Sequence, residues 1–165
     1  MIIRRLTVLL FLFFTISCGG IDFVYNNSKN LSNPIYNKTD FEFSGKELSS
    51  MYRYSSRYFG NSKNPEYILK VFIEEEKTKR SVQTNQAVSK LDYELNFIFQ
   101  INSTVKKCLV YEKNIISRFS YVPKSSGYNF GSDQSLQKLY ELAIKESLEE
   151  LIKFISSIDN FVCIN

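Results

Sequence analysis

The chain has 165 residues, of which 44% are hydrophobic and 15% aromatic, so it is long and apolar enough for one domain with its own core. It contains no histidine, the commonest general base and metal ligand, and this argues against a hydrolase or a metalloenzyme. Its formal net charge of +4 is too small to indicate a nucleic-acid-binding protein.

The first 17 residues are typical of a segment that directs export and is then removed. Arg4 and Arg5 carry positive charge, and residues 6–16 form an apolar run. The run has eleven residues, whereas a membrane-spanning helix needs about 20. The small residue Ser17 and then Cys18 follow it, and this ending resembles the lipoprotein signal of bacteria.

The resemblance to a lipoprotein signal implies that residues 1–17 are a signal peptide and that Cys18 is the lipidated first residue of a single domain, 18–165. Two or more acyl chains, palmitate among them, would hold such a protein stably in a membrane. Gly19, rather than aspartate, after the cysteine implies the outer membrane, with the protein on its periplasmic side.

Two other interpretations of this region stay open. One is an ordinary secretory signal, in which Cys18 has no role. The other is a eukaryotic secreted protein, because four Asn-x-Ser/Thr sequons begin at Asn26, Asn30, Asn37 and Asn102. In a bacterial lipoprotein these sequons are coincidental.

The mature chain is predicted to begin with short elements. Ile21, Phe23 and Tyr25 alternate along residues 19–25 and predict a short strand. Residues 26–40 are rich in Asn, Ser and Pro and indicate a tether. Phe41 and Phe43 alternate in the same way and predict a second short strand.

A helix is predicted from about residue 45 to residue 57. Ser44 and Glu47 have the spacing of a capping box, in which two side chains satisfy backbone donors at the start of a helix. The helix should end near Gly60. Its predicted buried face consists of Leu48, Met51, Tyr52 and Ser55.

Residues 88–101 show the clearest alternation in the chain, and they predict a long strand that is apolar on one face only. The apolar face consists of Leu91, Tyr93, Leu95, Phe97, Phe99 and Ile101. The other face is polar, apart from Ile98, and consists of Asp92, Glu94, Asn96 and Gln100.

Two further strands are predicted on either side of this one. Residues 67–73 place four apolar side chains on one face: Tyr67, Leu69, Val71 and Ile73. The polar residues 74–85 after them indicate a solvated strand end or a hairpin rim. Residues 108–122 alternate less regularly, and the adjacent Ile115 and Ile116 suggest a β-bulge.

A long helix, capped by Ser132 or Asp133, is predicted to end the domain. Its apolar stripe has helical spacing and consists of Leu136, Tyr140, Ala143, Ser147, Leu151, Ile155 and Ile158. The fold class is therefore predicted to be α+β: a mostly antiparallel sheet of about four strands with two helices packed on one face.

Cys108 and Cys163 have two possible states. The bacterial envelope outside the inner membrane is oxidising, so they could form a disulfide. They could equally be buried as small apolar side chains, because sequence alone does not place two cysteines within bonding distance.

The order of these elements resembles the LPS-assembly lipoprotein family (LptE). The segments that carry the resemblance start at Tyr67 (Tyr-Ile-Leu-Lys-Val), Leu91 (Leu-Asp-Tyr-Glu-Leu) and Ser117 (Ser-Arg-Phe-Ser-Tyr), and the helix around Ala143 follows them. The family's Arg-aromatic strand matches Arg118, Phe119 and Tyr121, and its Tyr-containing strand pair matches Tyr67 and Tyr93. The family's Cys-Gly-Phe start is replaced by Cys18-Gly19-Gly20, with the phenylalanine delayed to Phe23.

The resemblance implies a protein without enzymatic activity, cofactor, metal or nucleic-acid partner. It implies an outer-membrane lipoprotein that plugs the β-barrel of the LPS translocon, supports its assembly and aids LPS insertion. Its partners would be the barrel, LPS and, through Cys18, the membrane. Lipid A phosphates favour Lys and Arg, and the candidate LPS-binding residues are Lys77, Lys79, Arg80, Lys106, Lys107 and Arg118.

Four of these residues, Lys77, Lys79, Arg80 and Arg118, are expected to meet at one side of the sheet. Two other functions remain as alternatives. An auxiliary lipoprotein of an envelope lipid-transport complex would co-purify with an inner-membrane complex instead of a barrel. An envelope enzyme is disfavoured, because the chain contains no nucleophile elbow and no recognisable pair of catalytic acids.

Overall fold

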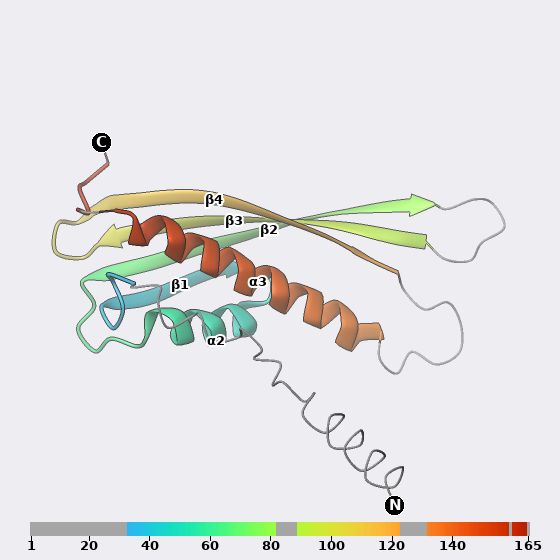
Figure 1. The fold of residues 1–165 in the computed structure, drawn as a ribbon, viewed down its shortest axis with the longest axis horizontal. Coiled ribbons are helices and arrows are strands. Elements are labelled where there is room, and N and C mark those ends of the chain that lie inside the picture. The colour runs from blue at the N-terminus through green and yellow to red at the C-terminus, as the bar shows by residue number, and fades with distance from the viewer. Residues whose placement is uncertain (1–32, 82–88, 123–131, 159, 165) are drawn as a thin grey trace, which may run out of the picture. The chain divides into compact units, whose positions relative to one another are not determined.

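The computed structural model describes residues 33–81, 89–122, 132–158 and 160–164 (Figure 1). The predicted signal peptide, Cys18, the predicted strand at 19–25 and the first part of the predicted tether lie outside the described residues. The elements are, in order, β1 (Thr39–Gly45), α2 (Leu48–Phe59), β2 (Tyr67–Ser81), β3 (Ser89–Ser103), β4 (Cys108–Tyr121) and α3 (Ser132–Ser156).

The four strands form one sheet in the order β1-β2-β3-β4. β1 pairs with β2 in parallel, whereas the β2–β3 and β3–β4 pairs are antiparallel. A parallel pair needs a crossover connection, and α2 provides it. Figure 1 shows α2 and α3 on the same side of the sheet. The predicted α+β fold class, with two helices on one face of a mostly antiparallel sheet, is confirmed.

The face of the sheet that α2 and α3 cover, here called the inner face, carries the core. The predicted alternation of β3 is confirmed, since the five side chains from Tyr93 to Ile101 on this face are at most 4% exposed. The predicted stripe of α3 is buried as well, from Tyr140 to Ile155. The buried surface of α3 is wider than predicted, because this helix packs against α2 as well as the sheet. Its additional buried residues are Ile144, Leu148 and Ile152.

Polar contacts join α2 to α3. Arg53 and Glu141 form an ion pair at 2.8 Å, and the Tyr58 hydroxyl donates to the Glu149 carboxylate at 2.6 Å. Burial of Tyr58 and this hydrogen bond both raise the pKa of its phenol. The two helices are therefore held in a defined alignment on the sheet.

The predicted start of α2 is wrong. β1 stays paired with β2 as far as Gly45, so Ser44 remains in extended backbone and forms no capping box. The helix begins at Leu48 after Glu47, which has a φ of 57° and makes no side-chain cap. Because the start has moved, the buried face consists of Ser50, Met51, Ser55 and Phe59, while Leu48 and Tyr52 are exposed.

Residues 74–81 are the end of β2, paired with β3 and exposed from residue 76 to residue 80, so of the two predicted alternatives the solvated strand end is confirmed and the hairpin rim is not. The predicted β-bulge at Ile115 and Ile116 is wrong. Ile115 and Ile116 both pair regularly with β3. Ile116 lies on the face of the sheet away from the helices, where its side chain is 47% exposed. The irregularity lies nearer the start of β4, where Val110 is the extra residue and its side chain is buried.

Cys108 and Cys163 form a disulfide, with their Cα atoms 5.7 Å apart. The bond ties the C-terminal tail, residues 160–164, to the start of β4. The backbone N–H of Ile164 also donates to the Leu109 carbonyl oxygen, and the ring of Phe161 lies 5.4 Å from that of Tyr67. The tail is thus part of the folded domain.

Candidate functional site: a charged pocket on the outer face

The face of the sheet opposite the helices, here called the outer face, bears a pocket beyond the end of β1. β1 makes its last pair at Ile73, and β2 continues with β3 and β4 beyond it (Figure 1). The pocket has a volume of about 410 Å³. Its charged lining residues are Glu76, Arg80, Lys90, Asp92, Glu94 and Arg118.

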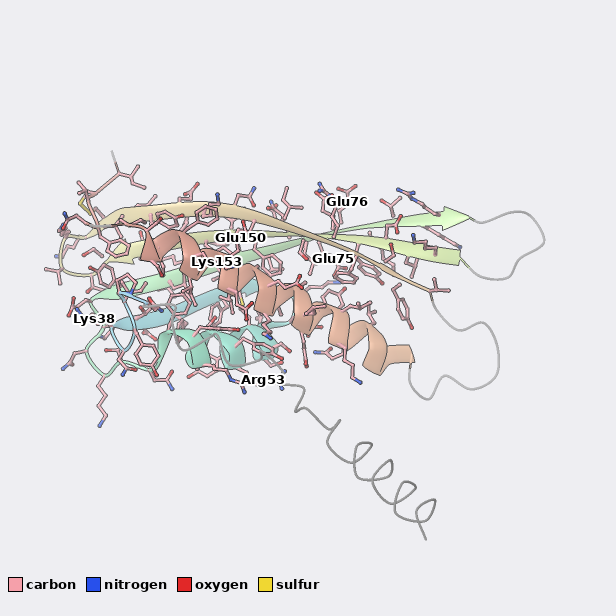
Figure 2. All side chains as sticks on the ribbon, in the orientation of Figure 1. Lys38, Arg53, Glu75, Glu76, Glu150 and Lys153 are labelled. Carbon is pink, nitrogen blue, oxygen red and sulfur yellow. A yellow bond between two sulfur atoms is a disulfide. The ribbon has the colours of Figure 1, made fainter. Side chains whose placement is uncertain are left out.

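Strand register brings these charges together in rows across the three strands. Glu76 of β2, Glu94 of β3 and Arg118 of β4 form one row. Arg80 of β2 is paired with Lys90 of β3 in another row. Since side chains alternate between faces, all five point to the outer face. Figure 2 shows Glu76 and its neighbour Glu75 on opposite sides of the sheet.

Each arginine of the pocket is held by a carboxylate on β3. Arg118 contacts Glu94 at 2.8 Å, and Arg80 contacts Asp92 at 2.6 Å, both through Nε. Lys90 lies 3.7 Å from Asp92. The hydroxyl of Ser120 donates to Asp92, and this hydrogen bond, with Arg80 and Lys90, lowers the pKa of the Asp92 carboxyl.

The six charged side chains of the pocket balance, three positive against three negative. Even so, the side chains of Arg80 and Arg118 are 71% and 68% exposed. A guanidinium has five N–H donors, so an exposed arginine held through Nε can still offer its terminal donors to a phosphate. The pocket is therefore suited to a ligand that carries anionic groups without being strongly attractive to every anion.

Aromatic side chains support the pocket from the inner side. Tyr93 and Phe119, which also line it, stack with ring centroids 5.1 Å apart. Tyr140 of α3 meets both rings edge-on, at 5.9 and 5.3 Å. Arg118, Phe119 and Tyr93, which carry part of the family resemblance, thus lie in one place in the fold.

The six candidate LPS-binding residues lie in three separate places. Arg80 and Arg118 share the pocket. Lys77 and Lys79 lie at the same end of the sheet but on its inner face, and the ammonium of Lys77 lies 5.4 Å from the centroid of the Tyr93 ring. The expectation that all four meet on one side therefore holds only for the arginines, because strand alternation continues through Arg80.

Lys106 and Lys107 lie at the opposite end of the sheet, in the turn between β3 and β4. Lys106 donates to the carbonyl oxygen of Phe161 at 2.9 Å, and Lys107 has a φ of 55°.

Lys90 lines the pocket but was not predicted as a site residue. Its position two residues before Asp92, on the polar face of the long strand, was the signal that could have identified it.

Cys18, the predicted lipidation site, lies outside the described residues. Within the described ranges, no group of three or more His, Cys, Asp or Glu side chains is arranged to hold a metal ion. None of the helices described is both long enough and apolar enough to cross a membrane.

Comparison by sequence finds no matching family model and no matching curated protein. Solved structures do match. A protein from Caulobacter crescentus CB15, provisionally assigned as a lipoprotein, aligns with a TM-score of 0.55 at 9% identity, over 79% of this chain and 92% of that one. This match shows a shared fold.

Two weaker matches are also lipoproteins. Rare lipoprotein B from Shewanella oneidensis has a TM-score of 0.49 and 16% identity, over 73% of this chain and 95% of that one. A minor lipoprotein from Acinetobacter baumannii has a TM-score of 0.48 and 19% identity, over 74% and 92%.

Proposed function

We propose that this protein is a lipoprotein of the outer membrane, anchored through lipidated Cys18 on the periplasmic side, with no enzymatic activity. Its role is to plug and support the β-barrel of the LPS translocon and to aid LPS insertion. The membrane, the barrel and LPS are its partners, and it requires no cofactor.

Two observations, taken together, carry the proposal. A segment that resembles a lipoprotein signal ends at Cys18, and the chain after it has the fold shared with the Caulobacter protein assigned as a lipoprotein. The resemblance of Tyr67, Tyr93, Arg118 and Phe119 to the LPS-assembly family adds the specific role.

The pocket offers a contact for LPS. Arg80 on β2 and Arg118 on β4 flank β3 and are mostly exposed, so both guanidinium groups could reach phosphates on one lipid A headgroup. The titratable side chains with a lowered pKa, such as Asp92 and Glu141, are held by hydrogen bonds and ion pairs. These contacts support a structural role for both carboxylates.

The anchor is tested on the protein purified from its own membrane. Mass spectrometry of the N-terminus should show residue 18 as the first residue, with acyl chains attached. Cys18→Ser should release the protein from the membrane fraction. An unmodified N-terminus at another residue would reject lipidation and favour an ordinary secretory signal.

The partner is tested by affinity purification from an envelope solubilised in mild detergent. The proposal predicts an outer-membrane β-barrel in a stoichiometric amount. Recovery of an inner-membrane complex instead would replace the proposal with an auxiliary lipoprotein of an envelope lipid-transport complex. The Cys18→Ser variant is the matched control. It lacks the proposed anchor, so it shows whether the barrel is recovered only because both proteins lie in the same membrane.

A further inference from the structure

The edge strand β4 offers a long backbone edge. β3 pairs with β4 on one side, and α3 packs against its inner face. In the described part of the chain, the other edge of β4 has a backbone contact only near its start, where Ile164 donates to Leu109 at 2.8 Å. Unpaired N–H and C=O groups along an edge strand favour pairing with another strand.

We propose that two copies of this chain associate through their β4 edges, antiparallel and centred on Ile115, into one continuous sheet with four strands from each copy. A two-fold axis perpendicular to the sheet relates the copies, so each residue meets a residue from the same face. The proposal goes beyond the proposed function and requires neither LPS nor a barrel.

The charges on the outer face of β4 are self-complementary in this register. Glu112 lies opposite Arg118 of the second copy, and the symmetry makes this pair twice. Arg118 uses Nε for Glu94 within its own chain, and its guanidinium has further donors for a second carboxylate. Asn114 lies opposite Ile116, so the two Ile116 side chains, each 47% exposed in one copy, become diagonal neighbours.

The inner face of β4 is compatible with the same register. Tyr111 lies opposite Phe119, and Ile115 lies opposite its own copy. Inward-pointing lysines often protect edge strands from pairing. Here the Lys113 ammonium lies 3.8 Å from the ring centroid of Phe154 on α3, which draws it off the edge. In the dimer, Lys113 lies opposite Ser117 of the second copy, which carries no charge.

The ends of the pairing fit as well. The register pairs residues 111–119 of both copies and stops before Leu109, where the C-terminal tail already occupies the edge. Shifting the centre to Ile116 places Glu112 opposite Ser120 and Arg118 opposite Asn114, which removes both ion pairs. Charge complementarity therefore selects Ile115 as the centre.

A charge swap tests the association. The full lipidated protein is purified in detergent, without barrel or LPS, and its mass is measured by analytical ultracentrifugation. Wild type should give a dimer. Glu112→Arg places like charges opposite each other twice and should weaken association roughly tenfold. Adding Arg118→Glu restores opposite charges and should restore the dimer. Circular dichroism checks that each variant is folded.

Cysteine pairs test the register without altering charge. Asn114→Cys protein mixed with Ile116→Cys protein should form a mixed disulfide under mild oxidation, located by peptide mapping. Ile116→Cys alone should not, because in this register Ile116 does not face itself. A monomeric wild type would overturn the proposal, as would efficient self-linking of Ile116→Cys or equal association of all charge variants.

Discussion

Tyr140 on α3 donates its phenolic hydrogen to the Glu75 carboxylate on β2, and this contact joins the long helix to the sheet. Lys46 binds the same carboxylate at 2.9 Å, and the side chain of Glu75 is only 10% exposed. Burial alone would raise the pKa of Glu75, but the hydrogen bonds from Tyr140 and Lys46 outweigh it and lower that pKa. This carboxylate is therefore kept ionised by two partners, Tyr140 of α3 and Lys46 of the loop between β1 and α2.

Removing the Tyr140 hydroxyl should destabilise the protein measurably. Tyr140→Phe keeps the ring contacts with Tyr93 and Phe119 but leaves the carboxylate with one donor fewer. The expected loss in free energy of unfolding is about 1.5–3 kcal/mol, typical of hydrogen bonds to charged groups. Urea denaturation measures it. Tyr52→Phe, on an exposed tyrosine, is the control and should change stability by less than about 0.5 kcal/mol.

Glu75 should also make stability depend on pH in acid. Its pKa in the folded protein is lower than the ordinary glutamate value of 4.5, so its contribution is present above about pH 4.5 and is lost as pH falls through the folded pKa. Tyr140→Phe removes part of the lowering, so its stability should fall less steeply in this range. Urea midpoints from pH 7 to pH 3 measure this. Parallel curves for variant and wild type would contradict it.

The disulfide should contribute substantially to stability. It joins two cysteines that are separated by 55 positions in the sequence. A disulfide that closes a loop of this size typically stabilises the folded protein by about 2–5 kcal/mol. Replacing Cys108 and Cys163 together with serine should lower the unfolding free energy by that amount. Wild type with dithiothreitol should lose a similar amount. The serine variant should not respond to the reductant, and a response would point to another redox-sensitive group.

The two pocket arginines should account for any LPS binding by the described domain. Arg80→Gln with Arg118→Gln should weaken binding about tenfold at low salt, because each change removes a charged donor and leaves a carboxylate unbalanced. Lys106→Gln with Lys107→Gln removes equal charge at the opposite end of the sheet and is the matched control. Binding to LPS vesicles is the measurement. An equal loss in both double variants would indicate general attraction to anions instead of a site.

The pattern of amino acids alone predicts correctly which face of the long strand is buried. Leu95, Phe97 and Phe99 share a parity, and a strand presents alternate residues to one side whatever its neighbours are. The buried stripe of α3 also follows from local sequence, because helical spacing brings Tyr140, Ala143 and Ser147 to one face. Local geometry was enough in both cases.

Where some elements begin and end, and which charges meet, depends on contacts in the folded chain. Ser44 stays extended because β2 pairs with it, and a local capping pattern contains no information on that pairing. Lys77 and Arg80 lie on opposite faces because pairing with β3 extends β2 through residues whose charges were compatible with a strand end or a hairpin rim. The bond between Cys108 and Cys163 depends on the path of the whole intervening chain. These features require contacts between residues far apart in sequence, which the pattern along any single segment does not specify.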